Sequence, residues 1–181
     1  MYESAAPPQE DTADAEATSV SKATTESLMA GERILESLHT ADADIEQREQ
    51  AQRLGQDVPV HPLVQAMFSE METPDTYKYV LRVVEKIPPT HMEDALLVLP
   101  FDKVVSLFRY IDVWITREWN VSLSARILFF LMRTHHAQIV SNRVMRTTLV
   151  RLRTHVKNVL AKQKTLVGFN LAALRYLQQQ H

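Results

Sequence analysis

The sequence predicts an all-α protein: a bundle or short solenoid of about six to eight helices, preceded by an acidic, largely disordered N-terminal segment. Only three glycines occur in 181 residues, Gly31, Gly55 and Gly168. An all-β protein needs many such residues for the positive-φ turns of its hairpins. From residue 61 onward, apolar residues recur with the three- and four-residue spacing of amphipathic helices.

The first 59 residues are expected to form a lead-in to the main domain. Residues 1–21 are acidic and poor in large apolar side chains, so burial cannot offset the entropy lost on ordering, and we expect disorder there. Apolar residues from Thr24 to Leu38 predict a weak amphipathic helix. The polar stretch up to Asp57 is typical of a linker or a solvated helix. The chain thus divides into an acidic linker or weakly helical lead-in over residues 1–59 and an all-helical domain over residues 60–181.

Two short helices are predicted at the start of this domain. Pro62 suits the first turn of a helix, and an apolar stripe follows from Leu63 to Met71. From Tyr77 to Val84, apolar side chains recur at the i, i+3, i+4 and i+7 positions of a second helix, which has to stop before Pro88.

A third short helix is expected between two proline stops. Thr90 and Glu93 have the spacing of a capping box, in which each side chain satisfies an unpaired backbone N–H of the other residue. Pro100 disfavours helical geometry in the residue before it, so the helix cannot run past Val98 or Leu99.

The next two helices are predicted to form most of the core. Pro100 can open the first of them, whose core-facing stripe runs over residues 101–115. Asn120 or Ser122 can cap the second. Residues 127–132 of the second helix are apolar on all sides, which predicts a helix surrounded by others at the centre of the fold.

Two more helices complete the prediction. Residues 145–160 place their apolar side chains on one face of a long helix. A final helix is expected after Gly168, with Leu171, Leu174 and Leu177 along one side.

Charge is segregated along the chain. Residues 1–70 carry 14 acids and 4 bases, whereas residues 120–181 carry no acid and 10 bases. Such a basic segment indicates a solvated face, a surface that docks an acidic partner, or a surface that binds nucleic acid phosphates. The candidate residues of this basic face are Arg143, Arg146, Arg153, Lys157 and Lys164.

No group of residues in the sequence indicates catalysis or a metal site. The absence of cysteine excludes disulfides and thiolate ligands, and there is no Gly-rich phosphate loop, nucleophile elbow or HExxH pair. His135 and His136 point about 100° apart on a helix, so they cannot ligate one ion together. The longest wholly apolar run, residues 127–132, is far shorter than the roughly 20 residues of a membrane span. We therefore expect a soluble, non-enzymatic protein with no cofactor, no small-molecule substrate and no membrane contact.

Three segments together resemble one known family. They are KIPPTHMEDALLVLPF at residues 86–101, RILFFLMRTHHAQIVSN at residues 126–142 and TLVGFNLAALRYL at residues 165–177. In residue type, order and spacing they are similar to the C-terminal domain of the Utp-twelve (Dip-two) family, and the resemblance covers roughly residues 60–180.

The resemblance implies an all-helical module that follows WD-repeat propellers in subunits of the UTP-B complex, within the U-three-containing small-subunit processome of the nucleolus. It implies a role in pre-rRNA processing and small ribosomal subunit biogenesis through binding of the homologous C-terminal domains of other UTP-B subunits. Pre-rRNA or small nucleolar RNA is a further candidate partner, for which we expect indirect contact. The alternative is an RNA-docking module that uses the basic helix over residues 143–164. The interface candidates are Leu96, Leu97, Leu99, Phe101, Trp114, Phe169, Leu171 and Leu174.

Overall fold

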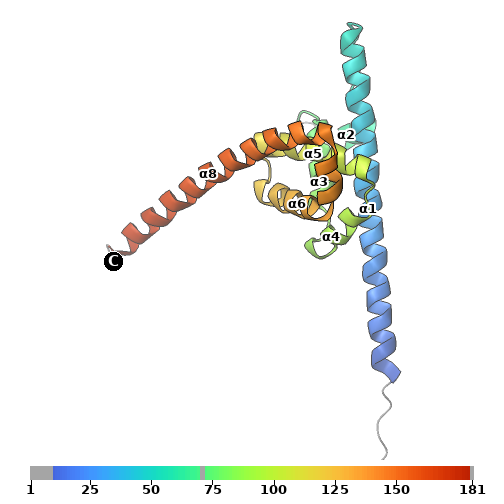
Figure 1. The fold of residues 1–181 in the computed structure, drawn as a ribbon, viewed down its shortest axis with the longest axis vertical. Coiled ribbons are helices and arrows are strands. Elements are labelled where there is room, and N and C mark those ends of the chain that lie inside the picture. Colours follow the sequence, from blue (N-terminus) through green and yellow to red (C-terminus); the bar gives the residue numbers. More distant parts are fainter. Residues whose placement is uncertain (1–9, 70–71, 180–181) are drawn as a thin grey trace, which may run out of the picture.

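The structure is a computed structural model that describes residues 10–69 and 72–179, with side chains described from residue 25 onward. Across these residues the chain forms helices and no strand, which confirms the predicted all-α class (Figure 1). None of these helices is long and apolar enough to cross a membrane. The helices are α1 (Glu10–Arg53), α2 (Pro62–Ala66), α3 (Thr76–Glu85), α4 (Pro89–Leu97), α5 (Phe101–Thr116), α6 (Val121–Thr134), α7 (His136–Ser141) and α8 (Arg143–Gln179).

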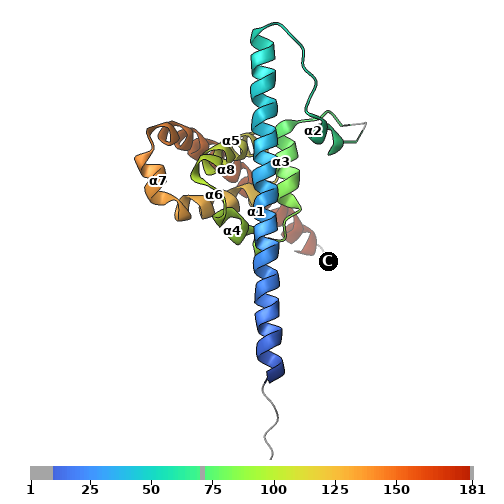
Figure 2. The same ribbon diagram turned by 90° about the vertical axis from the view of Figure 1, so that its right-hand side faces the viewer.

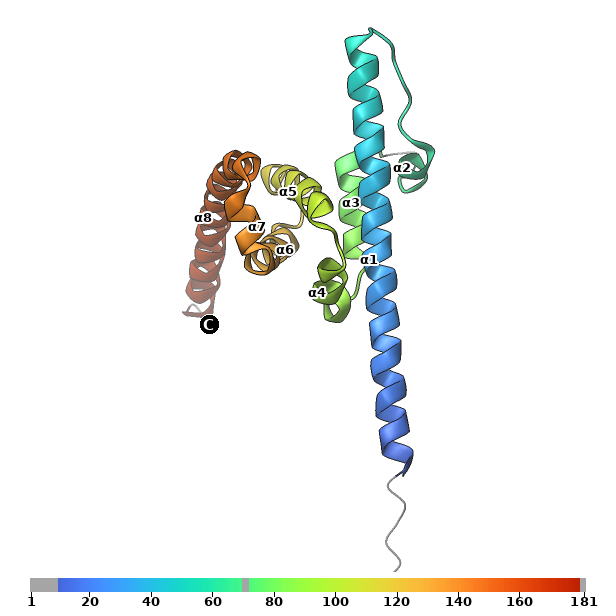
Figure 3. The same ribbon diagram turned by 45° about the vertical axis from the view of Figure 1, so that its right-hand side comes forward.

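Helix α5 lies at the centre of the fold. It packs against α1 and α3 on one side and against α6 and α8 on the other, so that α1 and α8 flank the body in Figure 3. Most of its apolar stripe is buried, with Phe108 and Trp114 at 0% exposure. The prediction that residues 127–132 form the central helix is wrong, because Phe129 of α6 is 62% exposed. An apolar run shows how much apolar surface a helix carries, but not which of its faces pack against a neighbouring helix.

Helix α1 shares the core of the domain. It begins at Glu10 and ends at Arg53, and so extends beyond both ends of the predicted Thr24–Leu38 helix, while residues 1–9 of the predicted disordered segment lie outside the described residues. Ile34 and Leu38 are completely buried, and Figure 2 shows α3 and α4 lying along α1. The predicted domain division after residue 59 stays a prediction, but α1 packs in the same core as α3 to α8.

Close packing of α1 on α4 depends on a small residue. A Cβ atom added to Gly31 would lie 3.0 Å from the carbonyl oxygen of Ala95 and 3.2 Å from Cβ of Val98. A side chain at position 31 would therefore push the two helices apart, because backbone and Cβ atoms cannot rotate away as a flexible chain end can.

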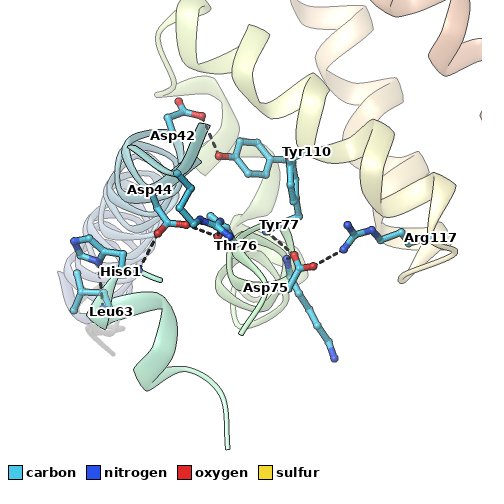
Figure 4. A network of polar contacts seen from close by, with 11 residues as sticks. Asp42, Asp44, His61, Leu63, Asp75, Thr76, Tyr77, Tyr110 and Arg117 are labelled. Carbon is cyan, nitrogen blue, oxygen red and sulfur yellow. Dashed lines mark hydrogen bonds and ion pairs between the residues drawn. The ribbon is translucent and has the colours of Figure 1, made fainter. Parts of the chain in front are cut away.

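Buried and half-buried carboxylates tie α1 to the rest of the domain (Figure 4). Asp44 is buried, and it accepts hydrogen bonds from the backbone N–H of His61, at 2.8 Å, and from the hydroxyl of Thr76. Asp42 accepts a hydrogen bond from the hydroxyl of Tyr110 at 2.9 Å. Burial and the nearby Asp42 carboxylate raise the pKa of this tyrosine well above its usual range.

Local signals placed several helix ends correctly. Helix α3 ends before Pro88, and α4 ends at Leu97, before Pro100, both as predicted. Asn120 caps α6 by accepting a hydrogen bond from the N–H of Leu123. The predicted helix from Leu63 to Met71 is shorter than expected, because α2 ends at Ala66, and Met71 lies outside the described residues.

The predicted capping box of α4 is wrong. The helix starts two residues earlier than the box requires, with Pro88 at the N-cap and Pro89 in the first turn, so Thr90 already lies inside the helix. No side chain caps this N-terminus. A proline in the first turn needs less capping, because it has no N–H to satisfy.

We predict that Asp75→Ala lowers the free energy of unfolding by about 1 kcal/mol, whereas Thr90→Ala leaves it within roughly 0.5 kcal/mol. Asp75 caps α3, and its side chain accepts from the N–H groups of Tyr77, at 2.9 Å, and Lys78, at 3.1 Å. Urea denaturation followed by circular dichroism measures both effects. An equal loss of unfolding free energy in the two variants would support a capping box at Thr90 after all.

The C-terminal region is one helix. Helix α8 continues through Gly168 to Gln179, so the separate final helix predicted after this glycine does not exist. Glycine inside a helix costs only about 1 kcal/mol relative to alanine, which an otherwise favourable sequence tolerates. Figure 1 shows the second half of α8 leaving the body and ending far from it.

Candidate interaction surface

Helix α8 is anchored to the body by its first half. Asn142 caps its start by accepting from the N–H groups of Val144 and Met145. Further along, Arg151 and His155 contact the buried carboxylate of Asp112 on α5, at 2.9 and 2.8 Å. Because both side chains approach one buried acid, they fix the rotation of α8 about its own axis and so determine which face turns outward.

An apolar groove lies between α6 and α8, with a volume of about 510 Å³. Leu128, Phe129 and Met132 of α6 form one wall. The α8 wall is made by the apolar residues Leu149, Val150, Leu152, Val156 and Leu160. Solvated apolar surface of this kind marks interaction sites when it is contiguous.

Three cations line the same groove: Arg146, Arg153 and Lys157. Their long aliphatic stems can cover apolar surface while the charged ends reach the rim. None of the three has an ion pair within the described residues. In contrast, Arg151 pairs with Asp112 on α5, and Lys162 pairs with Glu118 just after α5. The groove therefore combines an apolar floor with uncompensated positive charge.

The second half of α8, residues 161–179, is exposed along its whole length. We call this segment the α8 tail. It carries large apolar residues in water, namely Leu166, Val167, Phe169, Leu171, Leu174, Tyr176 and Leu177. At 100° per residue, Val167, Leu171 and Leu174 extend the stripe that Val156 and Leu160 present to the groove. The groove and the tail thus form one continuous apolar surface along α8.

The predicted interface residues differ in their exposure. Leu96, Leu99 and Trp114 are buried in the chain's own core, so they cannot contact a partner, and their selection is corrected. Phe101 is half-buried, with its ring 5.9 Å from the ring of His135. The exposed members are Leu97 on α4 and Phe169, Leu171 and Leu174 on the tail. Their role in an interface stays a prediction.

The predicted basic face also divides. Arg146, Arg153 and Lys157 lie in the groove, while Arg143 at the start of α8 and Lys164 on the tail are exposed outside it. Phe129 and Met132 were not expected at the surface, although the sequence contains one indication of their exposure. The apolar run of α6 is too broad for the single stripe with which a helix faces its own core, and the excess indicates a second apolar contact.

The residues described contain no group of three or more His, Asp or Glu side chains able to hold a metal ion. Four smaller depressions along the described chain are lined by polar side chains alone or by mixed polar and apolar side chains. The geometry therefore favours binding of a macromolecule along α8.

Comparison with known proteins gives consistent matches. The model of the Dip2/Utp12 Family matches residues 76–179, which contain α3 to α8. The chain is 30% identical over 181 residues to U3 small nucleolar RNA-associated protein 12 of Saccharomyces cerevisiae, a match that covers 91% of this chain and 19% of the yeast protein. It is 30% identical over 165 residues to WD repeat-containing protein 3 of Homo sapiens, covering 88% of this chain and 17% of the human protein. The WD repeat-containing protein 3 homolog of Dictyostelium discoideum is 29% identical over 163 residues. The chain thus spans less than about a fifth of the length of these relatives.

Proposed function

The chain belongs to the Dip2/Utp12 family, and on that basis we propose that it is a non-enzymatic assembly module of the UTP-B complex in the small-subunit processome. In this role it acts in the nucleolus, in pre-rRNA processing and small ribosomal subunit biogenesis, by binding homologous helical domains of other subunits. The name of the yeast relative, which associates that protein with U3 small nucleolar RNA, supports the cellular process.

One observation carries the proposal: the α8 tail presents a long apolar stripe to water. A helix of 19 residues, 161 to 179, is roughly 28 Å long, and exposed apolar surface of that extent is typical of an unfilled protein interface. The tail packs on no other helix of the described chain to any large extent, so packing against a partner would supply the stabilisation that helices generally draw from tertiary contacts.

Direct RNA docking through residues 143–164 is the weaker alternative. Arg151 is held by Asp112, and Lys162 is held by Glu118. Arg146, Arg153 and Lys157 line an apolar groove, where the floor gives a phosphate backbone nothing to bind. The residues therefore favour a protein partner over RNA.

We predict that the double variant Leu171→Glu and Leu174→Glu abolishes binding to a homologous domain and leaves the folded chain intact. Both side chains are exposed, so stability should change by less than roughly 0.5 kcal/mol, while two carboxylates would be forced into an apolar interface. The test is co-expression with the C-terminal helical domains of other UTP-B subunits, followed by light scattering and a thermal melt.

The matched control is Thr165→Glu with Ala172→Glu, which adds the same charge to exposed positions on another side of the tail. This control should assemble like the unmodified chain. The proposed function is abandoned if the unmodified chain remains a monomer with every homologous domain, and the tail loses its role if the Leu171 and Leu174 variant assembles normally.

A further inference from the structure

We infer that the groove between α6 and α8 is a docking site for an amphipathic helix of a partner protein, one that carries aliphatic side chains on one face and carboxylates along a single edge. The inference deepens the proposed function and rests on it for the kind of partner, another assembly subunit. It adds the chemistry by which that partner would be recognised.

The shape of the groove suits a helix. Its α8 wall runs from Arg146 to Leu160, which is roughly 21 Å or four helical turns. Phe129 and Met132 stand opposite and remain exposed. An apolar groove of this length is the site into which amphipathic helices insert the side chains of one face.

The sequence of α8 places a cationic row beside the apolar row. Leu149, Val156, Leu160 and Val167 follow one another at intervals of 7, 4 and 7 residues. Arg146, Arg153, Lys157 and Lys164 have the same intervals, each three residues before its apolar counterpart. Because three residues turn a helix by 300°, the charged row runs along one side of the apolar row at an offset of roughly 60°.

This arrangement defines where the partner's negative charge has to be. A helix that lies on the apolar row brings one of its edges alongside the cations and keeps its other edge away from them. The groove lining contains no Asp or Glu, so nothing within it neutralises Arg146, Arg153 and Lys157. Carboxylates that recur along one edge of the bound helix would supply that charge, in the manner of the charged flanks of coiled coils.

A second copy of this chain fits the groove poorly. Its α8 would bring the same cations, and residues 120–181 contain no acid to oppose them. The acidic helix α1 does not fit either, because its apolar residues Ile34 and Leu38 are already buried against its own domain. Charge complementarity therefore points to a different polypeptide.

The test uses two synthetic peptides of about 20 residues, which span roughly 30 Å as helices. Both carry the same leucine face; one has glutamates along one edge and the other has lysines at those positions. Fluorescence anisotropy measures their binding to the full chain and to the triple variant Arg146→Glu, Arg153→Glu, Lys157→Glu. The control variant Arg126→Glu, Arg133→Glu, Arg143→Glu changes the net charge equally at exposed positions outside the groove.

We expect the glutamate peptide to bind the unmodified chain and the control, and to bind the triple variant at least about tenfold more weakly. The lysine peptide should show the reverse preference, which a loss of folding could not produce. Equal binding of both peptides to all three proteins would overturn the inference. So would a result in which the triple variant loses only a single-stranded RNA probe.

The two proposals can fail separately. If the triple variant still assembles with a homologous domain as the unmodified chain does, the groove is not the docking site, yet the proposed function stands. If the unmodified chain binds the glutamate peptide and no homologous domain, the proposed function fails and the groove retains its specificity.

Discussion

Trp114→Ala is expected to lower the free energy of unfolding by about 3–5 kcal/mol, the usual cost of removing a large aromatic residue from a packed core. Trp114 is fully buried on the central helix α5, and its indole N–H donates to the carbonyl oxygen of Tyr77 at 2.8 Å. The substitution leaves a cavity and also removes the partner of a carbonyl on α3. Guanidinium denaturation followed by circular dichroism measures the loss.

Trp119→Ala is the matched control. Trp119 lies after the end of α5 and is only partly buried, with the Arg117 guanidinium over its ring at 4.8 Å. Its removal should therefore cost clearly less than removal of Trp114. If both variants lost the same stability, α5 would not be the centre of the core.

The sequence predicted best what short-range chemistry determines. The prolines at 88, 89 and 100 and the asparagine at 120 act on their own neighbours, so the end of α4 and the start of α6 could be placed without knowing the tertiary structure. The start of α4 was missed because two local signals competed there. The helix begins at Pro89, whereas a capping box with Thr90 as the N-cap requires it to begin after Thr90.

Long-range packing could not be read in the same way. Helix α1 enters the core through small and medium-sized residues such as Ala30, Gly31 and Ile34, which give a weak periodic signal. Their contribution becomes visible only when α4 lies against them. Conversely, the strong signal at residues 127–132 overstated the burial of α6, because Leu128, Phe129 and Met132 line the groove.

The candidate surface was predictable in its chemistry but not in its location. The spacing of Arg146, Arg153 and Lys157 beside an apolar stripe is visible in the sequence. Apolar content alone could not separate Leu96, which is buried, from Leu97, which is 54% exposed on the same helix. That distinction depends on which face of α4 meets α1, and so on the tertiary fold.

Asp44→Ala is expected to lower the free energy of unfolding by about 3 kcal/mol, because it leaves one buried and two partly buried partners without an acceptor. The Asp44 carboxylate pairs with Arg48 and accepts from the N–H of His61 and the hydroxyl of Thr76 (Figure 4). Through these contacts one buried side chain joins α1 to the start of α2 and to the first turn of α3. Asp44→Asn keeps an acceptor oxygen, so it should lose less stability than the alanine variant.

The control on the same helix is Glu49→Ala, which removes an exposed carboxylate and should change stability by less than roughly 0.5 kcal/mol. Urea denaturation gives the three free energies, and hydrogen exchange on α1 and α3 shows where protection is lost. If α1 folds cooperatively with the domain, Asp44→Ala weakens protection in both helices together. Unchanged stability of Asp44→Ala would show that the carboxylate does not couple α1 to the domain. Loss of protection in α1 alone would show that it holds only the end of this helix in place. Either result would make α1 an independent lead-in.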